Sequence, residues 1–477
     1  MKLIYDVEDK PKFGPLLVFA IQQLLAIMTA TLVVPIIINS DTGSQMSSAA
    51  ALFGAGCGTL IYVAFTNKKS PVFLGSSFAF IGSMLAAFGG ATSMALGYLG
   101  LIFGAVLAGL VYVVIAIIVK FAGVEWVNKL MPAVVIGPTV AIIGLSLAGN
   151  AVGDITTGGV KEAVTSYAID MTSGSPAIAE VTEKVSVASP LIALLAGLVT
   201  LAVTMSCSVY GKKSGKLIPF IYGILSGYGF CLILTLIGNA TGCDAIKLIS
   251  FDSFKTLTAD GVGIKTFFEL PQFTFMSACG AFGELSASYF GTLFAAYVPV
   301  AFVVFAEHIA DHKNISSIIE RDLLKEPGLH RTLLGDGVGS MVGALFGGCP
   351  NTTYGESIGC VAITKNASVY TIIAAAIGAI IISFISPFIA FVNSIPSCVM
   401  GGVCMALYGF IAVSGLKMVQ TVDLNKNKNL FVVSVILIAG IGKLTVSFGE
   451  VVITEVACAL ILGILANILL KKGPEEE

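Results

Sequence analysis

Long runs of apolar residues, separated by short polar connections, repeat along the whole of this 477-residue chain. The runs lie at roughly 14–38, 48–66, 71–88, 95–119, 131–148, 189–206, 217–237, 286–310, 331–347, 350–364, 369–391, 396–415, 429–443 and 451–470. About 20 apolar residues in a helix cross the hydrocarbon core of a bilayer. The pattern therefore predicts an all-α polytopic membrane protein with fourteen transmembrane segments, several of them short.

Composition supports this class of protein. The chain is 56% hydrophobic and only 11% charged, with a mean hydropathy of +0.96, whereas a soluble domain of this size carries more charge on its surface. The net charge of −2 and the lack of a basic cluster argue against a nucleic-acid partner. The ten cysteines are scattered without a CxxC pair, so we expect small core residues and neither a metal site nor a cofactor.

Lysine and arginine set the expected orientation, because cytoplasmic connections are enriched in them. The alternate connections hold Lys68, Lys69, Lys120, Lys129, Lys212, Lys213, Lys216, Lys313, Arg321, Lys325, Arg331, Lys365, Lys417, Lys426 and Lys428, and the tails hold Lys2, Lys10, Lys12, Lys471 and Lys472. The short connections between them (39–47, 89–94, 348–349 and 392–395) have none, and Lys443 is the one exception. We expect both termini on the cytoplasmic side of the plasma membrane.

Seven segments in each half is an odd number, so the second half is expected to lie inverted relative to the first. The first repeat would cover residues 1–237 and the second 286–477, with 238–285 as an extracellular loop. Residues 149–188 form a second long outer loop.

Two pairs of segments carry a trace of this repeat. Both the fifth and the twelfth segment open with a proline and a glycine-containing apolar run, at 131–138 and 395–402. The third and tenth segments are both interrupted by proline or glycine and polar in the middle, at 71–80 and 350–356. Broken segments at matching positions of two inverted halves indicate the midplane site of a transporter.

The tenth segment is too short to be a simple helix. Fifteen residues from Pro350 to Thr364 span about 22 Å as a helix, against about 30 Å of hydrocarbon. If 350–355 is extended, as Thr-Thr-Tyr favours, the segment becomes long enough. Extended backbone in a membrane needs a neighbouring strand or a polar cavity. We therefore expect a substrate site here, centred on Glu356.

Three further acids interrupt apolar runs. Glu307 lies in the eighth segment, where a carboxylate costs about 2.5–3.5 kcal/mol on insertion scales. Asp311 is one helical turn away and shares a face with Glu307, although it is near enough to the polar loop to reach solvent. His308 points elsewhere and is compatible with packing or with function. Asp336 lies in a glycine-rich stretch and is compatible with a buried site or with a helix cap.

Glu307 and Glu356, one from each half, suggest recognition of a planar ring with adjacent N–H and C=O groups. Carboxylates accept hydrogen bonds from N–H groups, and backbone N–H groups donate to the carbonyls. The rings of Phe78 and Tyr354 are suited to stacking on such a ligand. Because a buried carboxylate tends to hold a proton, we expect proton coupling at Glu307, Asp311 and Asp336.

These residues resemble the nucleobase–ascorbate transporter family, and within it the bacterial uracil permease branch. The resemblance covers nearly the whole chain and rests on 351–356, 358–359, 362–365, 75–80, 306–308, 132–138 and 396–402. It implies fourteen spans in a seven-plus-seven inverted repeat, with short antiparallel strands from segments 3 and 10. It also implies a core domain (segments 1–4 and 8–11), a gate domain (segments 5–7 and 12–14), proton symport and a homodimer.

Carried over by position, the resemblance assigns roles to individual residues. Glu307 and Glu356 would hold the polar edge of the base, and the backbone of Phe78, Tyr354 and Gly355 would complete the site. Ala30 would line the pocket, and Tyr408 would approach from the gate side.

Three positions depart from the family pattern and bear on the substrate. Ser357 follows the glutamate where the family has Asn, and Gln22-Gln23 replaces the usual Gln-His pair. Asp311 stands where uracil permeases have His, which resembles the purine branch, whereas Glu356 favours uracil over xanthine. The sequence thus predicts a uracil symporter, with a xanthine or purine permease of the same family as the alternative.

Other classes fit less well. An anion transporter with the same fold would need a positive site where these two acids lie. An enzyme would need a nucleophile–base pair or a metal cluster, and all three histidines lie between 308 and 330 without an HExxH motif. A channel favours fast release over the tight recognition that a pair of glutamates provides.

Overall fold

The structure is a computed structural model that describes residues 3–123, 126, 132–170, 177–259, 261–448 and 451–470. Four of the predicted cytoplasmic lysines, Lys2, Lys129, Lys471 and Lys472, lie outside these residues. The chain divides into two compact units. The first comprises residues 1–147, 267–389 and 407–477, and the second 148–266 and 390–406.

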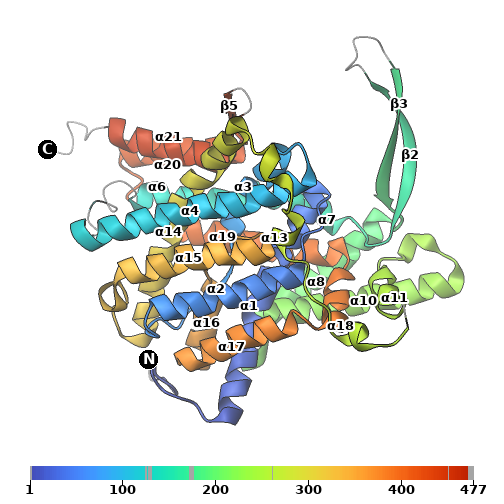
Figure 1. The fold of residues 1–477 in the computed structure, drawn as a ribbon, viewed down its shortest axis with the longest axis horizontal. Coiled ribbons are helices and arrows are strands. Elements are labelled where there is room, and N and C mark those ends of the chain that lie inside the picture. Colours follow the sequence, from blue (N-terminus) through green and yellow to red (C-terminus); the bar gives the residue numbers. More distant parts are fainter. Residues whose placement is uncertain are drawn as a thin grey trace. The chain divides into compact units, whose positions relative to one another are not determined.

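The first unit is built mainly from helices (Figure 1). Its main elements are α1 (Phe13–Thr42), α2 (Ser48–Phe65), β1 (Leu74–Ser76), η1 (Phe78–Phe80), α3 (Ile81–Gly89), α4 (Met94–Ala122), α6 (Ala133–Ser146), α13 (Thr274–Ser277), η3 (Ala281–Glu284), α14 (Ala287–Ile319), η4 (Leu324–Gly328), α15 (Leu329–Gly347), β4 (Asn351–Thr353), α16 (Gly355–Thr364), α17 (Val369–Ile382), α20 (Asn427–Ile441), β5 (Val446–Phe448), β6 (Val451–Ile453) and α21 (Glu455–Leu469). Two further helices, α18 (Ser386–Asn393) and α19 (Ser397–Val419), each begin in one unit and end in the other.

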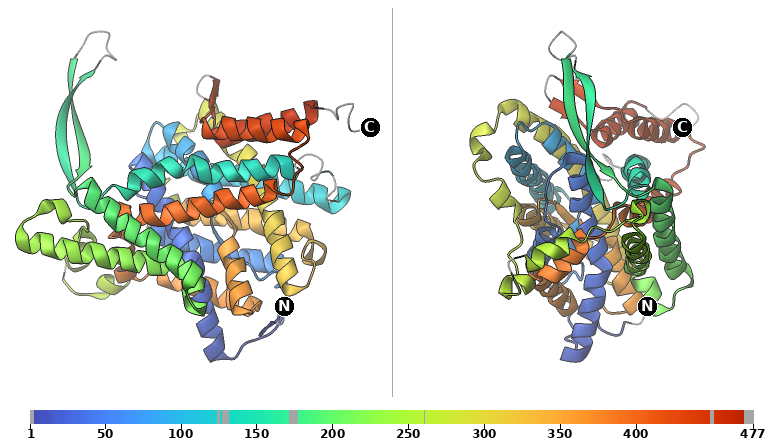
Figure 2. Two further views of the ribbon diagram at one scale, coloured as in Figure 1. Left: turned by 180° about the vertical axis from the view of Figure 1, so that it is seen from behind. Right: turned by 90° about the vertical axis from the view of Figure 1, so that its right-hand side faces the viewer.

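The second unit contains α7 (Ala148–Ile155), β2 (Lys161–Asp170), β3 (Ala177–Ser186), α8 (Pro190–Tyr210), α9 (Lys213–Leu217), α10 (Pro219–Thr241), η2 (Asp244–Ile246) and α11 (Asp252–Thr258), and α12 (Ile264–Phe267) ends at its border. Strands β2 and β3 pair antiparallel along their full length (Figure 2). Ordered structure here differs from the expectation of plain loops at 149–188 and 238–285. Val164, Thr165 and Val181 are β-branched residues that favour a strand.

Within the described residues, eight helices are long and apolar enough to cross a membrane: 13–42, 48–65, 94–122, 133–155, 190–210, 219–241, 287–319 and 397–419. Shorter apolar helices lie at 78–89, 369–382, 427–441 and 455–469. A helix is found within each of the fourteen predicted segments, and the chain is a multi-pass membrane protein. How many of these segments cross the membrane stays a prediction.

Helices α2 and α15 pack with their backbones in close approach. A Cβ atom added to Gly54 would lie 2.6 Å from the carbonyl oxygen of Gly343, and one added to Gly58 would lie 2.7 Å from that of Gly339. Small residues spaced four apart allow such contact between helices in a membrane. The packed helices lie beside the two strands: α2 contacts β1, and α15 contacts both β1 and β4.

Candidate functional site

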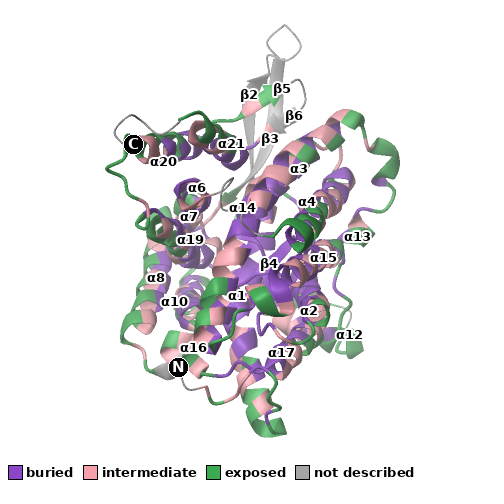
Figure 3. Ribbon diagram, turned by 90° about the vertical axis from the view of Figure 1, so that its left-hand side faces the viewer, coloured by how far each residue is buried: buried purple, intermediate pink, exposed green. Residues whose placement is uncertain are grey.

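Two short strands, β1 and β4, form the centre of the candidate site. They pair antiparallel with Leu74 opposite Thr353, Gly75 opposite Thr352 and Ser76 opposite Asn351. Every residue of both strands is buried, and Figure 3 shows β4 among other buried segments. The pairing gives hydrogen-bond partners to extended backbone that lipid could not supply.

A helical segment begins directly after each strand. Ser77 precedes η1 and α3, and its N–H donates to the carbonyl of Pro350 at 2.9 Å. Tyr354 precedes α16, and its N–H donates to the carbonyl of Phe73 at 3.2 Å. Two helix N-termini therefore lie at the ends of the paired strands β1 and β4. Each has unpaired N–H groups and a partial positive charge.

The two predicted glutamates lie near each other, beside the paired strands β1 and β4. Glu356 lies in the first turn of α16, where the helix dipole stabilises a carboxylate. Glu307 lies within α14, which packs against both β4 and α16. Both side chains are half-buried, and they are near enough to interact electrostatically. The structure thus brings together two acids that are far apart in the sequence.

Asp311 belongs to the same group. It is half-buried, and its Oδ2 accepts a hydrogen bond of 2.8 Å from the hydroxyl of Thr353 in β4. It also interacts electrostatically with Glu307 and Glu356. Asp311 therefore links α14 to β4, and its role at the site stays a prediction.

His308 and Asp336 form a separate, fully buried cluster. The Nδ1 of His308 lies 2.6 Å from the Oδ2 of Asp336, and its Nε2 lies 3.0 Å from the hydroxyl of Thr332. Asp336 is in the middle of α15, so it is not a helix cap, and its Oδ1 has no hydrogen-bond partner in the described structure. The ring of His308 also stacks on that of His312, with centroids 4.0 Å apart.

Hydrogen positions in this cluster follow from its acceptors. Thr332 donates its single hydroxyl proton to the carbonyl of Leu329 at 3.0 Å. Its oxygen must therefore accept from His308, whose Nε2 carries a proton. One further proton then lies between His308 Nδ1 and Asp336 Oδ2, on either the carboxyl group or the imidazole.

The predicted aromatic residues Tyr354 and Phe78 each make a specific contact within the protein. The hydroxyl of Tyr354 donates to the carbonyl of Ser76 at 2.6 Å, which ties the end of β4 to β1. Phe78 contacts Tyr408 edge to face, with ring centroids 6.1 Å apart. Tyr354 interacts electrostatically with both glutamates.

The remaining predicted residues are placed less directly. Ala30 is buried in α1, a helix that packs against β1 and α16. Gly355 is the exposed first residue of α16. Gly355 directly precedes Glu356 in the chain.

Several polar residues of the site were not singled out from the sequence. The hydroxyls of Ser77 and Thr352 are buried and have no hydrogen-bond partner in the described structure, so they remain available to a ligand. The hydroxyl of Thr353 donates to Asp311. Ser357 and Gln23 were noted in the sequence, but the hydrogen bond between them was not predicted. The signal for these residues was present in the polar character of 350–357, although the identity of their partners was not.

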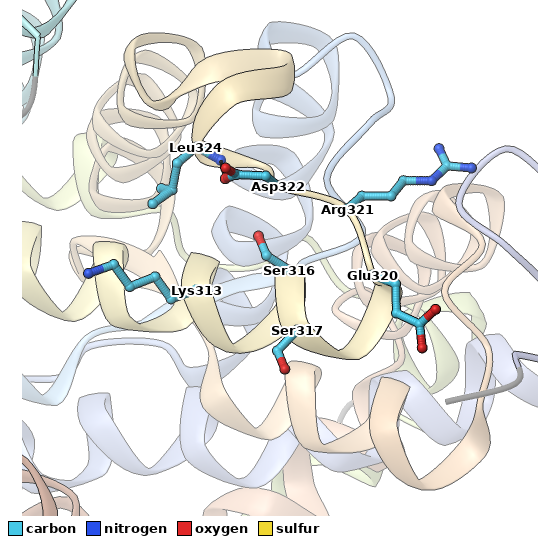
Figure 4. Close-up of a pocket in the computed structure, with 7 residues that line it drawn as sticks. All are labelled: Lys313, Ser316, Ser317, Glu320, Arg321, Asp322 and Leu324. Atoms are coloured by element: carbon cyan, nitrogen blue, oxygen red, sulfur yellow. Dashed lines mark hydrogen bonds between the residues drawn. The ribbon is translucent and has the colours of Figure 1, made fainter.

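A pocket of about 320 Å³ opens at the C-terminal end of α14 (Figure 4). Its lining comprises Lys313, Ser316, Ser317, Glu320, Arg321, Asp322 and Leu324. Arg321 points away from the other lining residues and pairs with Asp6 at 2.6 Å. This lining contains basic and acidic side chains, whereas the predicted site contains acids, aromatic rings and backbone groups.

Sequence comparison assigns the chain to a family. Residues 14–448 match the xanthine–uracil permease model, described as "Permease family". The uracil permease of Bacillus caldolyticus is 37% identical over 480 residues, covering 99% of this chain and 96% of that protein. The chain belongs to the nucleobase–ascorbate transporter family. The resemblance recognised in the motifs is thereby confirmed.

Further relatives support the same assignment. The uracil permease of Bacillus subtilis strain 168 is 36% identical over 482 residues, covering 100% of this chain and 97% of that protein. The uracil permease of Escherichia coli K12 is 32% identical over 467 residues, covering 98% and 93%. Because these relatives are permeases, the family member described here is a transporter and not an enzyme.

Solved structures share the fold at low sequence identity. The transmembrane domain of the cyanobacterial bicarbonate transporter BicA has a TM-score of 0.59 at 13% identity and covers 97% of this chain and 100% of that chain. The murine Slc26a9 anion transporter has a TM-score of 0.57 at 13% identity and covers 97% and 69%. The chain therefore shares its overall fold with these two structures.

Proposed function

We propose that this protein is a proton-coupled symporter that imports uracil across the plasma membrane. The observation that carries the proposal is the meeting of Glu307 and Glu356 beside the paired strands β1 and β4. Relatives named uracil permease, at 32–37% identity over nearly the full chain, support the choice of substrate.

The chemistry of the site suits a flat ring with alternating N–H and C=O groups. The carboxylates of Glu307 and Glu356 would accept hydrogen bonds from ring N–H groups, and such charge-assisted bonds are stronger than neutral ones. The free hydroxyls of Ser77 and Thr352, together with N–H groups of the two helix N-termini, would donate to ring carbonyls. Phe78, Tyr354 and Tyr408 would provide apolar ring surface.

Proton coupling is assigned to Glu307, Asp311 and Asp336. Glu307, Asp311 and Glu356 interact electrostatically, and in a setting of low dielectric constant at least one of these three would hold a proton. The extra proton between Asp336 and His308 supplies a second store, on the other face of α14. Substrate binding would then favour one protonation state of the acids.

The finer architecture is part of this proposal. The fourteen segments would form two inverted repeats, with a core domain of segments 1–4 and 8–11 and a gate domain of segments 5–7 and 12–14. Both termini would be cytoplasmic, and residues 238–285 would lie outside the cell. Two copies of the chain would assemble in the bilayer as a homodimer.

A purine permease of the same family is the second candidate. Asp311 supports it, because an acid at this position resembles the purine branch. Its carboxylate accepts a hydrogen bond from Thr353 of β4. An anion transporter, as the solved structures with this fold are named, is less well supported. Two carboxylates next to the helix N-termini would repel an anion that those N-termini would otherwise attract.

Uptake of radiolabelled uracil, competed by a panel of unlabelled pyrimidines and purines, tests the proposal. We expect uracil to compete best and an uncoupler to stop accumulation. Stronger competition by xanthine would favour the purine alternative. Accumulation that persists with the uncoupler would contradict proton coupling.

A further inference from the structure

The hydroxyl of Ser357 joins three separate parts of the chain. It accepts a hydrogen bond of 3.0 Å from the backbone N–H of Phe73, just before β1. It also accepts a short hydrogen bond from the side-chain amide of Gln23 in α1. Ser357 is fully buried and Gln23 is 2% exposed, so water does not replace either bond.

The hydroxyl of Ser357 lies next to Glu356, the residue proposed to bind the substrate. Ser357 follows Glu356 in the first turn of α16. The N–H of Phe73 binds the hydroxyl of Ser357, and the carbonyl of Phe73 accepts from the N–H of Tyr354. Both backbone groups of Phe73 are therefore held by residues that flank Glu356 on either side. The hydroxyl fixes the start of α16 relative to β1.

We infer that Gln23 and Ser357 act as one positioning unit that sets the location of the Glu356 carboxylate for the substrate. Neither residue is charged, so the unit acts through geometry and not through the field at the site. The inference rests on the proposed function in that its test uses uracil. A buried donor that loses its acceptor carries the full cost of desolvation, so changing one member alone should harm the site.

The test measures the KM and the maximal rate of uracil uptake, together with the amount of protein in the membrane. We expect Ser357→Ala to raise KM about tenfold or more, the size expected when one buried hydrogen bond is lost. Ser357→Thr keeps the hydroxyl and should restore uptake to near the original KM. Ser83→Ala is the matched control, since Ser83 is equally buried and binds the carbonyl of Ala296 at 2.7 Å, at a distance along α14 from Glu307.

A double-mutant cycle gives the sharper test. Gln23→Ala and Ser357→Ala should each raise KM alone, and the double variant should cost less than the sum of the two losses, because both single variants break the same hydrogen bond. A KM unchanged in Ser357→Ala, or losses that simply add in the double variant, would overturn the inference. Failure of the unaltered protein to take up uracil would instead contradict the proposed function, so the two results are distinguishable.

Discussion

The two faces of α14 place adjacent residues in opposite settings. Glu307 is half-buried near Glu356 and Asp311. Thr353 of β4 donates a hydrogen bond to Asp311. His308 is fully buried, and both of its ring nitrogens are paired with α15 through Asp336 and Thr332. One face presents acids that lack partners of opposite charge among the residues that the structure describes. The other is a nearly satisfied polar core.

This difference separates recognition from internal storage of a proton. Groups on the Glu307 face can change partners when a substrate arrives, because no lysine or arginine of the described residues forms a salt bridge with them. Groups on the His308 face are held by α15, and Asp336 Oδ1 is the only side-chain atom of that cluster without a partner among the described residues. A change on the first face should therefore affect binding, and a change on the second should affect coupling or stability.

Glu307→Gln should have the largest effect. The substitution keeps the shape of the side chain and removes the charge that accepts ring N–H groups, so a charge-assisted bond worth about 1.5–3 kcal/mol is lost. Uracil uptake should fall by about tenfold to a hundredfold while the protein still inserts in the membrane. Uptake equal to that of the unaltered protein would remove Glu307 from the site.

Asp336→Asn should separate the two faces most clearly. The amide of Asn can donate to His308 Nδ1, so packing is retained at a cost of about 0.5–1.5 kcal/mol in the free energy of unfolding. We expect uracil binding to persist while proton-driven accumulation is lost, as measured by equilibrium binding and by uptake with an imposed pH gradient. Normal accumulation would limit this cluster to a packing role.

Tyr354→Phe should have a moderate effect. It removes the bond from the tyrosine hydroxyl to the carbonyl of Ser76 and keeps the aromatic ring. A loss of about 0.5–1.5 kcal/mol should raise the KM for uracil by about twofold to tenfold. Tyr62→Phe, which alters a buried hydroxyl bound to His312 on the other face, serves as the comparison. An equal rise in KM in both variants would contradict a specific role for Tyr354.

The ion pair between Lys69 and Glu326 should give the smallest effect. It lies outside the spans, and the hydrogen bond from Lys69 lowers the pKa of Glu326 from its usual value. Because the pKa is lowered, the stabilisation is present above the ordinary pKa of a glutamate, about 4.3, and is lost as the pH falls through the lower value. Glu326→Gln should leave uptake at neutral pH unchanged and flatten the acid side of a plot of thermal stability against pH.

Much of the site was predictable because its signals are local. The shortness of 350–364 predicted extended backbone, and the structure has a strand at Asn351–Thr353. The cost of burying a carboxylate in an apolar run singled out Glu307 and Glu356, which lie near enough to interact electrostatically. In each case the residue and its immediate neighbours contain the physical reason.

The partners across the fold were not predictable in this way. Nothing near His308 in the sequence identifies Asp336 or Thr332 as its partners, and nothing near Ser357 identifies Gln23, because these contacts depend on how the helices pack. Residues 149–188 were predicted as a long outer loop, and the β2–β3 pair within them was not identified from the sequence.

The most direct test of the central claim is equilibrium binding of radiolabelled uracil to the purified protein and to Glu356→Gln. The account predicts that binding weakens about tenfold to a hundredfold in the variant, because the carboxylate accepts hydrogen bonds from the ring that an amide accepts less strongly. Thermal stability should stay close to that of the unaltered protein. Equal affinity for uracil in the two proteins would contradict the claim that Glu356 holds the substrate.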